Sequence, residues 1–276
     1  MTLHDLIVLK YAELPRLVRK PLWRFWHNLI LGRDRDHTDV RVTFLNYGFA
    51  PLSGNPNTIT LEPRDEPERF PAQLYHRALR SHDVNGDTVL EVGSGRGGGA
   101  SYITRYFRPK RYVGLDLAPK NIRFCNEYHG SDRLSFVQGD AERLPFADGS
   151  FDTVLNVESS RCYGNISRFF AEVRRVLRKH GVFLLTDMRW KDDLPQLRSR
   201  ITAAGFTIAE EENVTPNVAR ALDLDDRRRR GMIEQKIPKF LARAFGEFAG
   251  VKGSRRYSEF VSGRMQYVSM LLRAAV

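Results

Sequence analysis

Short apolar runs alternate with helical segments between residues 71 and 190, and this alternation dominates the pattern of the chain. Five runs have the length and the β-branched or aromatic content of buried strands: residues 88–92, 112–115, 134–137, 151–155 and 182–186. Segments with helix-like spacing of apolar positions separate them, at residues 68–81, 100–107, 119–128 and 166–179. Strands and helices in this alternation predict a mostly parallel sheet with helices on both faces.

Outside this core the pattern is weaker. Residues 46–71 are rich in proline and predict a loop, whereas residues 1–35 predict one or two helices. After the core we expect a helix over 194–204, a strand over 206–210, a helical stretch over 217–248 broken at Gly231 and Pro238, and a strand over 265–272. The chain therefore divides into an N-terminal helical and loop extension (1–70), a core (71–215), a helical cap (216–262) and a final strand of the core sheet (263–276).

A glycine-rich turn follows the first predicted strand and opens the next helix, in the sequence Gly-Ser-Gly-Arg-Gly-Gly-Gly at residues 93–99. Glycines let the backbone approach a ligand closely and adopt φ values that other residues avoid. No Gly-Lys-Ser/Thr sequence follows, which excludes a phosphate-binding P-loop. The turn is thus typical of a site that binds a nucleotide-like ligand without a P-loop.

Acidic residues stand at the ends of three successive predicted strands, namely Glu91, Asp116 and Asp140. Asp116 ends the second strand 19 positions after Gly97, where a doubly wound fold places a carboxylate on ribose hydroxyls. Asp140 can accept the exocyclic amine of adenine, and Ala141 leaves room for the ring. Each acid alone could be a helix N-cap or a turn residue. Three in succession favour a ligand site, because ligands of open α/β sheets bind at this edge.

Several motifs resemble those of the class I S-adenosylmethionine-dependent methyltransferases. They cover residues 91–97, 114–117, 139–146 and 151–154, with a further signature at 172–181. The resemblance implies a doubly wound, Rossmann-like α/β sheet of seven strands, the last of them antiparallel. It also implies S-adenosyl-L-methionine as cofactor and S-adenosyl-L-homocysteine as product. The cofactor-binding residues that it implies are Glu91, Gly93, Ser94, Gly95, Gly97, Asp116, Leu117, Asp140, Ala141 and Asn156.

A closer resemblance joins this chain to the mycobacterial phthiotriol and phenolphthiotriol dimycocerosate methyltransferases, through residues 74–77, 97–102, 156–160, 162–163 and 250–253. Those enzymes O-methylate a hydroxyl on a long polyketide-derived lipid. The resemblance implies an O-methyltransferase whose partner is a small hydroxylated acceptor, a lipid, polyketide or similar apolar metabolite. Related natural-product O-methyltransferases often carry histidine just after the fourth strand, but this chain has Arg161 and Cys162. Because arginine stays charged, either the base lies elsewhere or the reaction depends chiefly on positioning.

Three residues are candidates for the base that takes the hydroxyl proton, a role typically worth about 10²–10⁴-fold in rate. His76 lies on the helix before the glycine turn, and Glu158 and Asp187 lie at the ends of the fourth and fifth strands. Each could instead be an ordinary core or surface residue. A phenol titrates near 10, so tyrosines are poor bases. Tyr47, Tyr75 and Tyr163 are therefore candidates for the wall or lid of the acceptor site.

The formal net charge of +11 is compatible with two kinds of partner, nucleic acid and an anionic membrane. Residues 16–35 interleave basic with aromatic and aliphatic positions, which predicts peripheral membrane contact; docking on the protein's own domain is the alternative. The basic run 227–230 follows three aspartates and favours a solvated, salt-bridged helix over a nucleic-acid groove.

Other functions remain as alternatives. Nucleic-acid methyltransferases of this fold commonly carry an Asn/Asp-Pro-Pro-aromatic motif after the fourth strand, and residues 156–159 read Asn-Val-Glu-Ser, so no nucleic-acid partner is expected. A carbon methyltransferase of the sterol type and an inactive cofactor-binding protein are the other two alternative functions.

Cys125 and Cys162 lack the neighbours of a zinc site, so we expect no metal and a reducing, cytoplasmic compartment. No apolar run approaches the roughly 18 residues that span a bilayer.

Overall fold

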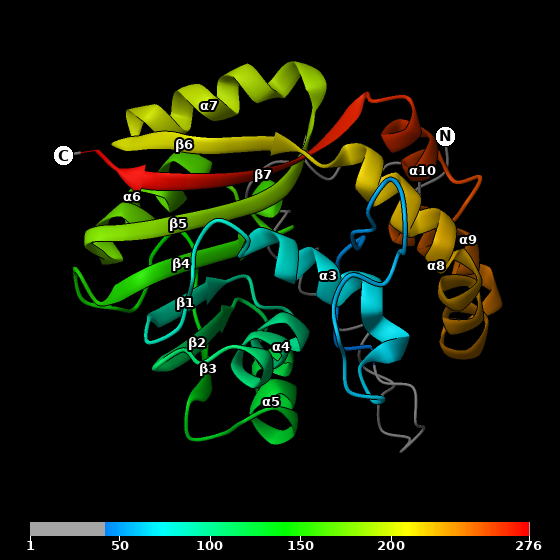
Figure 1. Ribbon diagram of the computed structural model, residues 1–276, viewed down its shortest axis with the longest axis horizontal. Coiled ribbons are helices and arrows are strands. Elements are labelled where there is room, and N and C mark those ends of the chain that lie inside the picture. The colour runs from blue at the N-terminus through cyan, green and yellow to red at the C-terminus, as the bar shows by residue number, and fades with distance from the viewer. Residues whose placement is uncertain (1–41, 276) are drawn as a thin grey trace.

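A single mixed sheet organises the chain in a computed structural model that describes residues 42–275 (Figure 1). The helices expected over residues 1–35 and the membrane segment 16–35 lie outside the described residues. The sheet has seven strands in the order β3-β2-β1-β4-β5-β7-β6. The strands are β1 (Thr88–Val92), β2 (Arg111–Asp116), β3 (Leu134–Gln138), β4 (Phe151–Val157), β5 (Leu177–Trp190), β6 (Phe206–Asn213) and β7 (Met265–Ala274).

The directions of the strands match the expected doubly wound sheet. Strands β1 to β5 run parallel to one another, and β7 pairs antiparallel with both β5 and β6. The prediction of a seven-stranded Rossmann-like sheet with an antiparallel last strand is therefore confirmed. Parallel strands end at one common edge, so the glycine turn and the acids after β1, β2 and β3 come together there.

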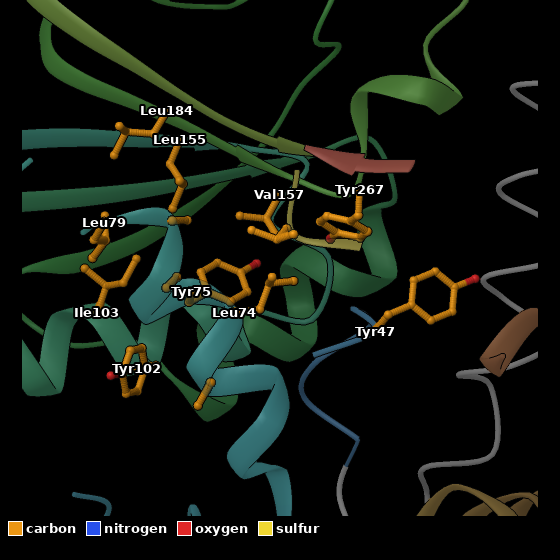
Figure 2. Close-up of a cluster of buried hydrophobic side chains, with 14 of the residues drawn as sticks. Tyr47, Leu74, Tyr75, Leu79, Tyr102, Ile103, Leu155, Val157, Leu184 and Tyr267 are labelled. Atoms are coloured by element: carbon orange, nitrogen blue, oxygen red, sulfur yellow. The ribbon is translucent and has the colours of Figure 1, made fainter. Parts of the chain in front are cut away.

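Helices cover both faces of the sheet (Figure 1). On one face lie α3 (Arg69–Ala78), α4 (Gly98–Tyr106) and α5 (Pro119–Tyr128), and on the other lie α6 (Ile166–Val176) and α7 (Leu194–Ala203). Successive strand residues point to opposite faces, so Leu155 belongs to the first core cluster and Val154 to the second. Figure 2 shows part of the first cluster, in which Leu79, the residue after α3, and Ile103 of α4 join Leu155 and Leu184 of the sheet.

Three helices stand between β6 and β7: α8 (Thr215–Lys236), α9 (Lys239–Ala249) and α10 (Arg255–Val261). We call these three helices the cap. Ile233, Phe245 and Val251 form a small apolar cluster inside it. Short 3₁₀ turns complete the secondary structure: η2 (Glu66–Glu68), η3 (Ser160–Cys162) and η4 (Lys191–Asp193). Among residues 42–275, no helix combines the length and the apolar content needed to cross a bilayer.

Several predicted element boundaries differ from the structure, and two of the differences have a clear physical cause. Helix α8 continues through Gly231, because a glycine inside a helix costs only about 1 kcal/mol and keeps its hydrogen bonds. The break falls at Pro238 instead, since the residue before a proline avoids the helical region and Ile237 is extended. Helix α6 ends at Val176 rather than at 179, because Leu177 already pairs with Phe151 as the first residue of β5.

Candidate active site

The glycine turn after β1 is held in a conformation that requires glycine. Gly93, Gly95 and Gly97 have φ values of +79°, +55° and +76°. A side chain at Gly93 would meet Ser159 and the hydroxyl of Tyr163, whereas one at Gly95 would meet only Leu45, at 3.4 Å. The turn therefore packs tightly on one side and leaves the backbone of Gly95 open to a ligand.

A cavity of about 1180 Å³, counting its open mouth, lies beside this turn at the carboxyl ends of the strands. Its lining combines glycine backbone, carboxyl groups and apolar side chains, which is the combination that small-molecule sites offer. The predicted residues that line it are Gly93, Ser94, Gly95, Asp116, Leu117, Asp140, Ala141, Tyr47, Tyr75, Glu158 and Tyr163.

The cofactor side of the cavity offers the polar groups that a nucleoside needs. One oxygen of Asp116 accepts from the amide of Ala118 at 2.8 Å and from the side chain of Asn121 at 3.1 Å, and the other accepts from the amide of Gly95 at 3.0 Å. Burial raises the pKa of Asp116 to about 6. The buried hydroxyl of Ser94 has no hydrogen-bond partner among the described residues. A carboxylate, an unused hydroxyl and glycine backbone together fit S-adenosylmethionine.

Glu91, expected to bind the cofactor, does not line the cavity. It is fully buried beneath the turn, where Tyr75 and Tyr112 donate hydrogen bonds to its two oxygens at 2.7 and 2.8 Å. Burial raises the pKa of Glu91 to about 7, although both hydroxyl groups oppose the shift. Glu91 thus fixes the Tyr75 side chain, which does reach the cavity wall.

Gly97 and Asn156 also lie outside the cavity lining. A side chain at Gly97 would run into Cys125, His129 and Phe136, so this glycine permits close packing against α5 and β3. Asn156 donates to the carbonyl of Val92 at 2.8 Å and to the hydroxyl of Tyr163 at 3.0 Å. The amide therefore positions the end of β1 and a cavity tyrosine.

His76, the first candidate base, is exposed and is absent from the cavity lining. Its Nδ1 lies 3.0 Å from the hydroxyl of Tyr102, and its ring packs near Phe107. Consecutive helix residues point about 100° apart, so when Tyr75 faces the sheet His76 faces outward. The structure therefore does not place His76 where it could take a proton from an acceptor in this cavity.

Glu158, the second candidate, lines the cavity in a constrained conformation. Its φ is +54°, and its amide donates to the carbonyl of Thr186 at 2.8 Å. Such a conformation in a non-glycine residue costs of order 1–3 kcal/mol and persists where surrounding contacts enforce it. One carboxyl oxygen accepts from the amide of Tyr47 at 3.0 Å and the hydroxyl of Tyr267 at 3.1 Å. Burial, reinforced by the charge of Asp187, raises the pKa of Glu158 to about 8.

Asp187, the third candidate, is fully buried and lies behind the cavity wall. It accepts from the hydroxyl of Ser160 at 2.6 Å and the amide of Arg161 at 3.2 Å, and it pairs with Arg189 at 3.2 Å. These contacts occupy its carboxylate. Asp187 therefore orients the η3 turn that follows β4 and leaves Glu158 as the candidate base that reaches the cavity.

Sequence reasoning missed Arg229. The basic run at 227–230 was expected to be solvated, but Arg229 is buried and pairs with Asp225 at 3.0 Å. It donates to the carbonyls of Tyr47 at 3.0 Å and Ala249 at 3.0 Å, and so joins the cap to the segment that covers the cavity. The spacing of four residues between Asp225 and Arg229 indicates an ion pair on one helix face. That spacing does not show whether the pair is buried.

Comparison with known proteins identifies the family. Residues 90–185 match the family described as "Methyltransferase domain". The chain is 38% identical over 251 residues to the phthiotriol/phenolphthiotriol dimycocerosates methyltransferase of Mycobacterium tuberculosis, which covers 90% of each protein. This chain belongs to the phthiotriol/phenolphthiotriol dimycocerosates methyltransferase family. It is accordingly an S-adenosylmethionine-dependent methyltransferase.

Two further comparisons agree with this assignment. The chain is 39% identical over 229 residues to the fatty-acid O-methyltransferase of Mycolicibacterium smegmatis, covering 83% of this chain and 82% of that one. Its fold is shared with the geranyl diphosphate C-methyltransferase of Streptomyces coelicolor, solved with S-adenosyl-L-homocysteine (TM-score 0.63, 16% identity, 95% of this chain and 100% of that chain). Within residues 42–275, no three His, Cys, Asp or Glu side chains gather as metal ligands.

Proposed function

We propose that this methyltransferase acts on a hydroxyl of a small apolar metabolite, such as a lipid, a polyketide or a related natural product. The observation that carries the proposal is Glu158, a partly buried carboxyl in the cavity wall next to apolar groups. Tyr47, Val157, Met188 and Phe248 line the same cavity. An acceptor with one hydroxyl and an otherwise apolar body matches this combination.

The chain's own residues would divide the work between two ends of the cavity. Asp116 would bind the ribose, Ser94 and the Gly95 backbone would hold the methionine part, and Ala141 with Leu117 would border the adenine. When bound, S-adenosylmethionine supplies a methyl group that its sulfonium already activates. The protein has then to orient the acceptor oxygen, exclude water and remove the hydroxyl proton.

Glu158 is suited to remove that proton. One carboxyl oxygen is held by Tyr47 and Tyr267. No described residue donates a hydrogen bond to the other oxygen, Oε1, which leaves it able to accept the proton. A pKa raised to about 8 makes the ionised carboxylate a stronger base than an exposed glutamate, at the cost of a smaller ionised fraction at neutral pH.

The relatives support an apolar acceptor. Their names refer to dimycocerosate lipids and to fatty acids. An aliphatic acceptor agrees with Met188 and Phe248 in the lining. A carbon methyltransferase remains the competing reaction, and the product distinguishes the two because only oxygen transfer gives a methyl ether.

The test is methylation of long-chain alcohols by the purified protein, with the product identified by mass spectrometry. We expect methyl ethers, and a loss of about 10²–10⁴-fold in rate for Glu158→Gln. Titration with S-adenosylhomocysteine, weakened in Asp116→Asn, verifies the cofactor site independently. Intact cofactor binding without methylation of any alcohol, over several chain lengths and ring types, would overturn the proposal.

Membrane contact through residues 16–35 is a separate proposal, motivated by their basic and aromatic composition. Sedimentation with anionic liposomes should decrease when residues 1–35 are removed. Equal sedimentation of both proteins would contradict it.

A further inference from the structure

One segment of the chain runs along the cavity from its cofactor half to its acceptor half. Residues 43–47 all line the cavity, and we call residues 43–50 the covering segment. At the cofactor end, the carbonyl of Thr43 accepts a hydrogen bond from the amide of Gly98, in the glycine turn, at 3.2 Å. A Cβ at Gly98 would come within 2.8 Å of the side chain of Phe44, so the segment lies in close contact with this turn.

At the acceptor end, the covering segment is bound to both sides of the cavity. The amide of Tyr47 donates to Glu158, and its hydroxyl donates to the carbonyl of Phe248 in α9. Its ring points away from Tyr75 and toward the cap (Figure 2), where it packs edge-on against Phe260 of α10 with the ring centroids 5.1 Å apart. Tyr47 therefore fixes the cap relative to the candidate base.

Leu45 lies between these two ends and is held differently from its neighbours. No hydrogen bond joins its backbone to any other described residue, whereas the amide of Phe44 and the carbonyl of Asn46 are both bonded. Its side chain is partly buried and lies beside the backbone of Gly95, 3.4 Å from where a Cβ would stand. Leu45 is thus held by its side chain alone, at the place where we expect the methionine part of the cofactor.

A bound cofactor would change the surroundings of Leu45 directly. S-adenosylmethionine seated on Gly95 would remove apolar surface of the Leu45 side chain from water, which favours the position that Leu45 occupies in this structure. Because only Asn46 separates the two residues, fixing Leu45 also restricts the Tyr47 amide that binds Glu158. Two sites are coupled when the ligand of one stabilises the conformation that the other requires.

We propose that Leu45 is a positioning residue that couples the two halves of the cavity. A cofactor on the glycine turn holds Leu45, and through Tyr47 this orders Glu158 and the cap for the acceptor. The inference rests on the proposed function in taking Glu158 and the cap as the acceptor half, and it adds an order of binding, cofactor before acceptor. Coupling of this kind is reciprocal and typically amounts to about 5–150-fold in affinity.

The first test needs no acceptor and measures hydrogen exchange of the full-length protein with and without saturating S-adenosylhomocysteine. In the wild type this ligand should slow the exchange of amides in residues 42–50 and 239–251 at least about fivefold. In Leu45→Ala it should still protect residues 93–99 but should no longer protect residues 239–251. Leu52→Ala is the matched control and should behave as the wild type, because Leu52 is 56% exposed and does not line the cavity.

Two further variants make the comparison independent of Leu45→Ala alone. Leu45→Met keeps an apolar side chain of similar volume and should retain the protection of residues 239–251. Leu45→Val shortens the side chain by one carbon and should lose part of that protection.

Four results of the exchange experiment would overturn the inference. In the wild type, the ligand could leave residues 239–251 unprotected. The protection could be the same in Leu45→Ala as in the wild type, or it could be lost equally in Leu45→Ala and Leu52→Ala. Finally, Leu45→Ala could fail to bind S-adenosylhomocysteine at all, which would make Leu45 part of the cofactor site itself.

The second test measures the coupling through the acceptor, by calorimetric titration with decan-1-ol. Decan-1-ol should bind the wild type at least about fivefold more tightly when S-adenosylhomocysteine is present. Leu45→Ala should lose this enhancement and keep the affinity of the ligand-free protein, so that with S-adenosylmethionine its KM for decan-1-ol rises more than its kcat falls. Equal affinities of the wild type in both states would overturn the inference. A wild type that binds decan-1-ol in neither state would count against the proposed function, and the exchange experiment would still decide the inference.

Discussion

The backbone amide of Tyr47 donates a hydrogen bond to a carboxyl oxygen of Glu158 at 3.0 Å, across 111 positions of sequence. The hydroxyl of the same tyrosine donates to the carbonyl of Phe248 in α9 at 2.8 Å. Tyr47 therefore ties the residue after β4 to the cap in the wall of the cavity that all three residues line. Because the amide donates to the carboxyl, its hydrogen bond is stronger when Glu158 is ionised, so the protonation state of the candidate base and the position of the covering segment are coupled.

The rate of alcohol methylation should therefore depend on the ionisation of Glu158. Only the carboxylate can take a proton, and burial raises the pKa of this group to about 8. We expect kcat/KM to rise with pH through about 8 and to level off above it, measured from pH 6 to 9.5. Glu158→Gln should flatten this profile. An inflection that persists in the variant would show that another group is the base.

The hydroxyl of Tyr267 should set where that inflection falls. It donates to Glu158 at 3.1 Å and thereby stabilises the ionised form. Tyr267→Phe keeps the buried ring but removes this donor, so the inflection should move upward by up to about one pH unit. Tyr257→Phe is the matched control, because its hydroxyl binds Asp223 on the outside of the cap. A profile unchanged in Tyr267→Phe would count against Glu158 as the titrating base.

The ionisation of Glu158 should also lower the stability of the folded protein as pH rises. Its folded pKa lies above the unfolded value of 4.5, so the folded protein holds a proton that the unfolded chain releases. Stability is then full below about pH 4.5 and is lost progressively until pH passes about 8. Glu158→Gln stays neutral, and relative to the wild type it should gain roughly 1–3 kcal/mol of unfolding free energy between pH 5 and 8. Urea unfolding of both proteins at pH 5 and at pH 8 measures this gain. A difference in unfolding free energy that is the same at both pH values would contradict the prediction.

Much of the fold could be predicted because its determinants are local. A buried strand such as β1 shows as a run of apolar residues, and a turn such as the one at Gly93 requires glycine wherever it occurs. Since parallel strands end at one edge, the sequence alone places the acids Asp116 and Asp140 near a common ligand. Topology brings both to this edge and they do line the cavity, whereas Glu91 of β1 reaches the same edge and is buried beneath it.

The rest of the site depends on rotations and long-range contacts that no local pattern records. His76 and Tyr75 are neighbours in sequence, and only the packing of α3 against the sheet decides which of them faces inward. Glu91 ends up beneath the cavity because Tyr75 and Tyr112 surround it. Similarly, the sequence presents Arg229 as one of four consecutive arginines, and only its contact with the carbonyl of Tyr47 distinguishes it from an exposed arginine.

Two helix glycines should respond oppositely to alanine. A Cβ at Gly99 would overlap the ring of Tyr75, which Glu91 holds in place, so Gly99→Ala should destabilise the protein by about 1–3 kcal/mol. A Cβ at Gly231 would meet nothing within 4 Å, so Gly231→Ala should stabilise α8 by about 0.5–1 kcal/mol. Urea unfolding of the two variants gives both values. A loss of stability in Gly231→Ala would mean that this glycine serves a contact outside the described residues.

Arg229 should contribute more to stability than its neighbour Arg230, because burial changes what its loss leaves behind. In Arg229→Gln the buried carbonyls of Tyr47 and Ala249 lose their donor and Asp225 keeps only its more exposed pair with Arg228. Breaking a buried ion pair costs about 3–5 kcal/mol, and the value here should fall toward the lower figure because Arg228 remains. Arg230→Gln, which breaks a more exposed pair with Asp226, should cost at most about 1 kcal/mol. Since Arg229 also anchors the segment over the cavity, its loss should raise KM for the acceptor, whereas Arg230→Gln should leave KM close to that of the wild type. Equal unfolding free energies for the two variants would show that the cap does not depend on the buried arginine.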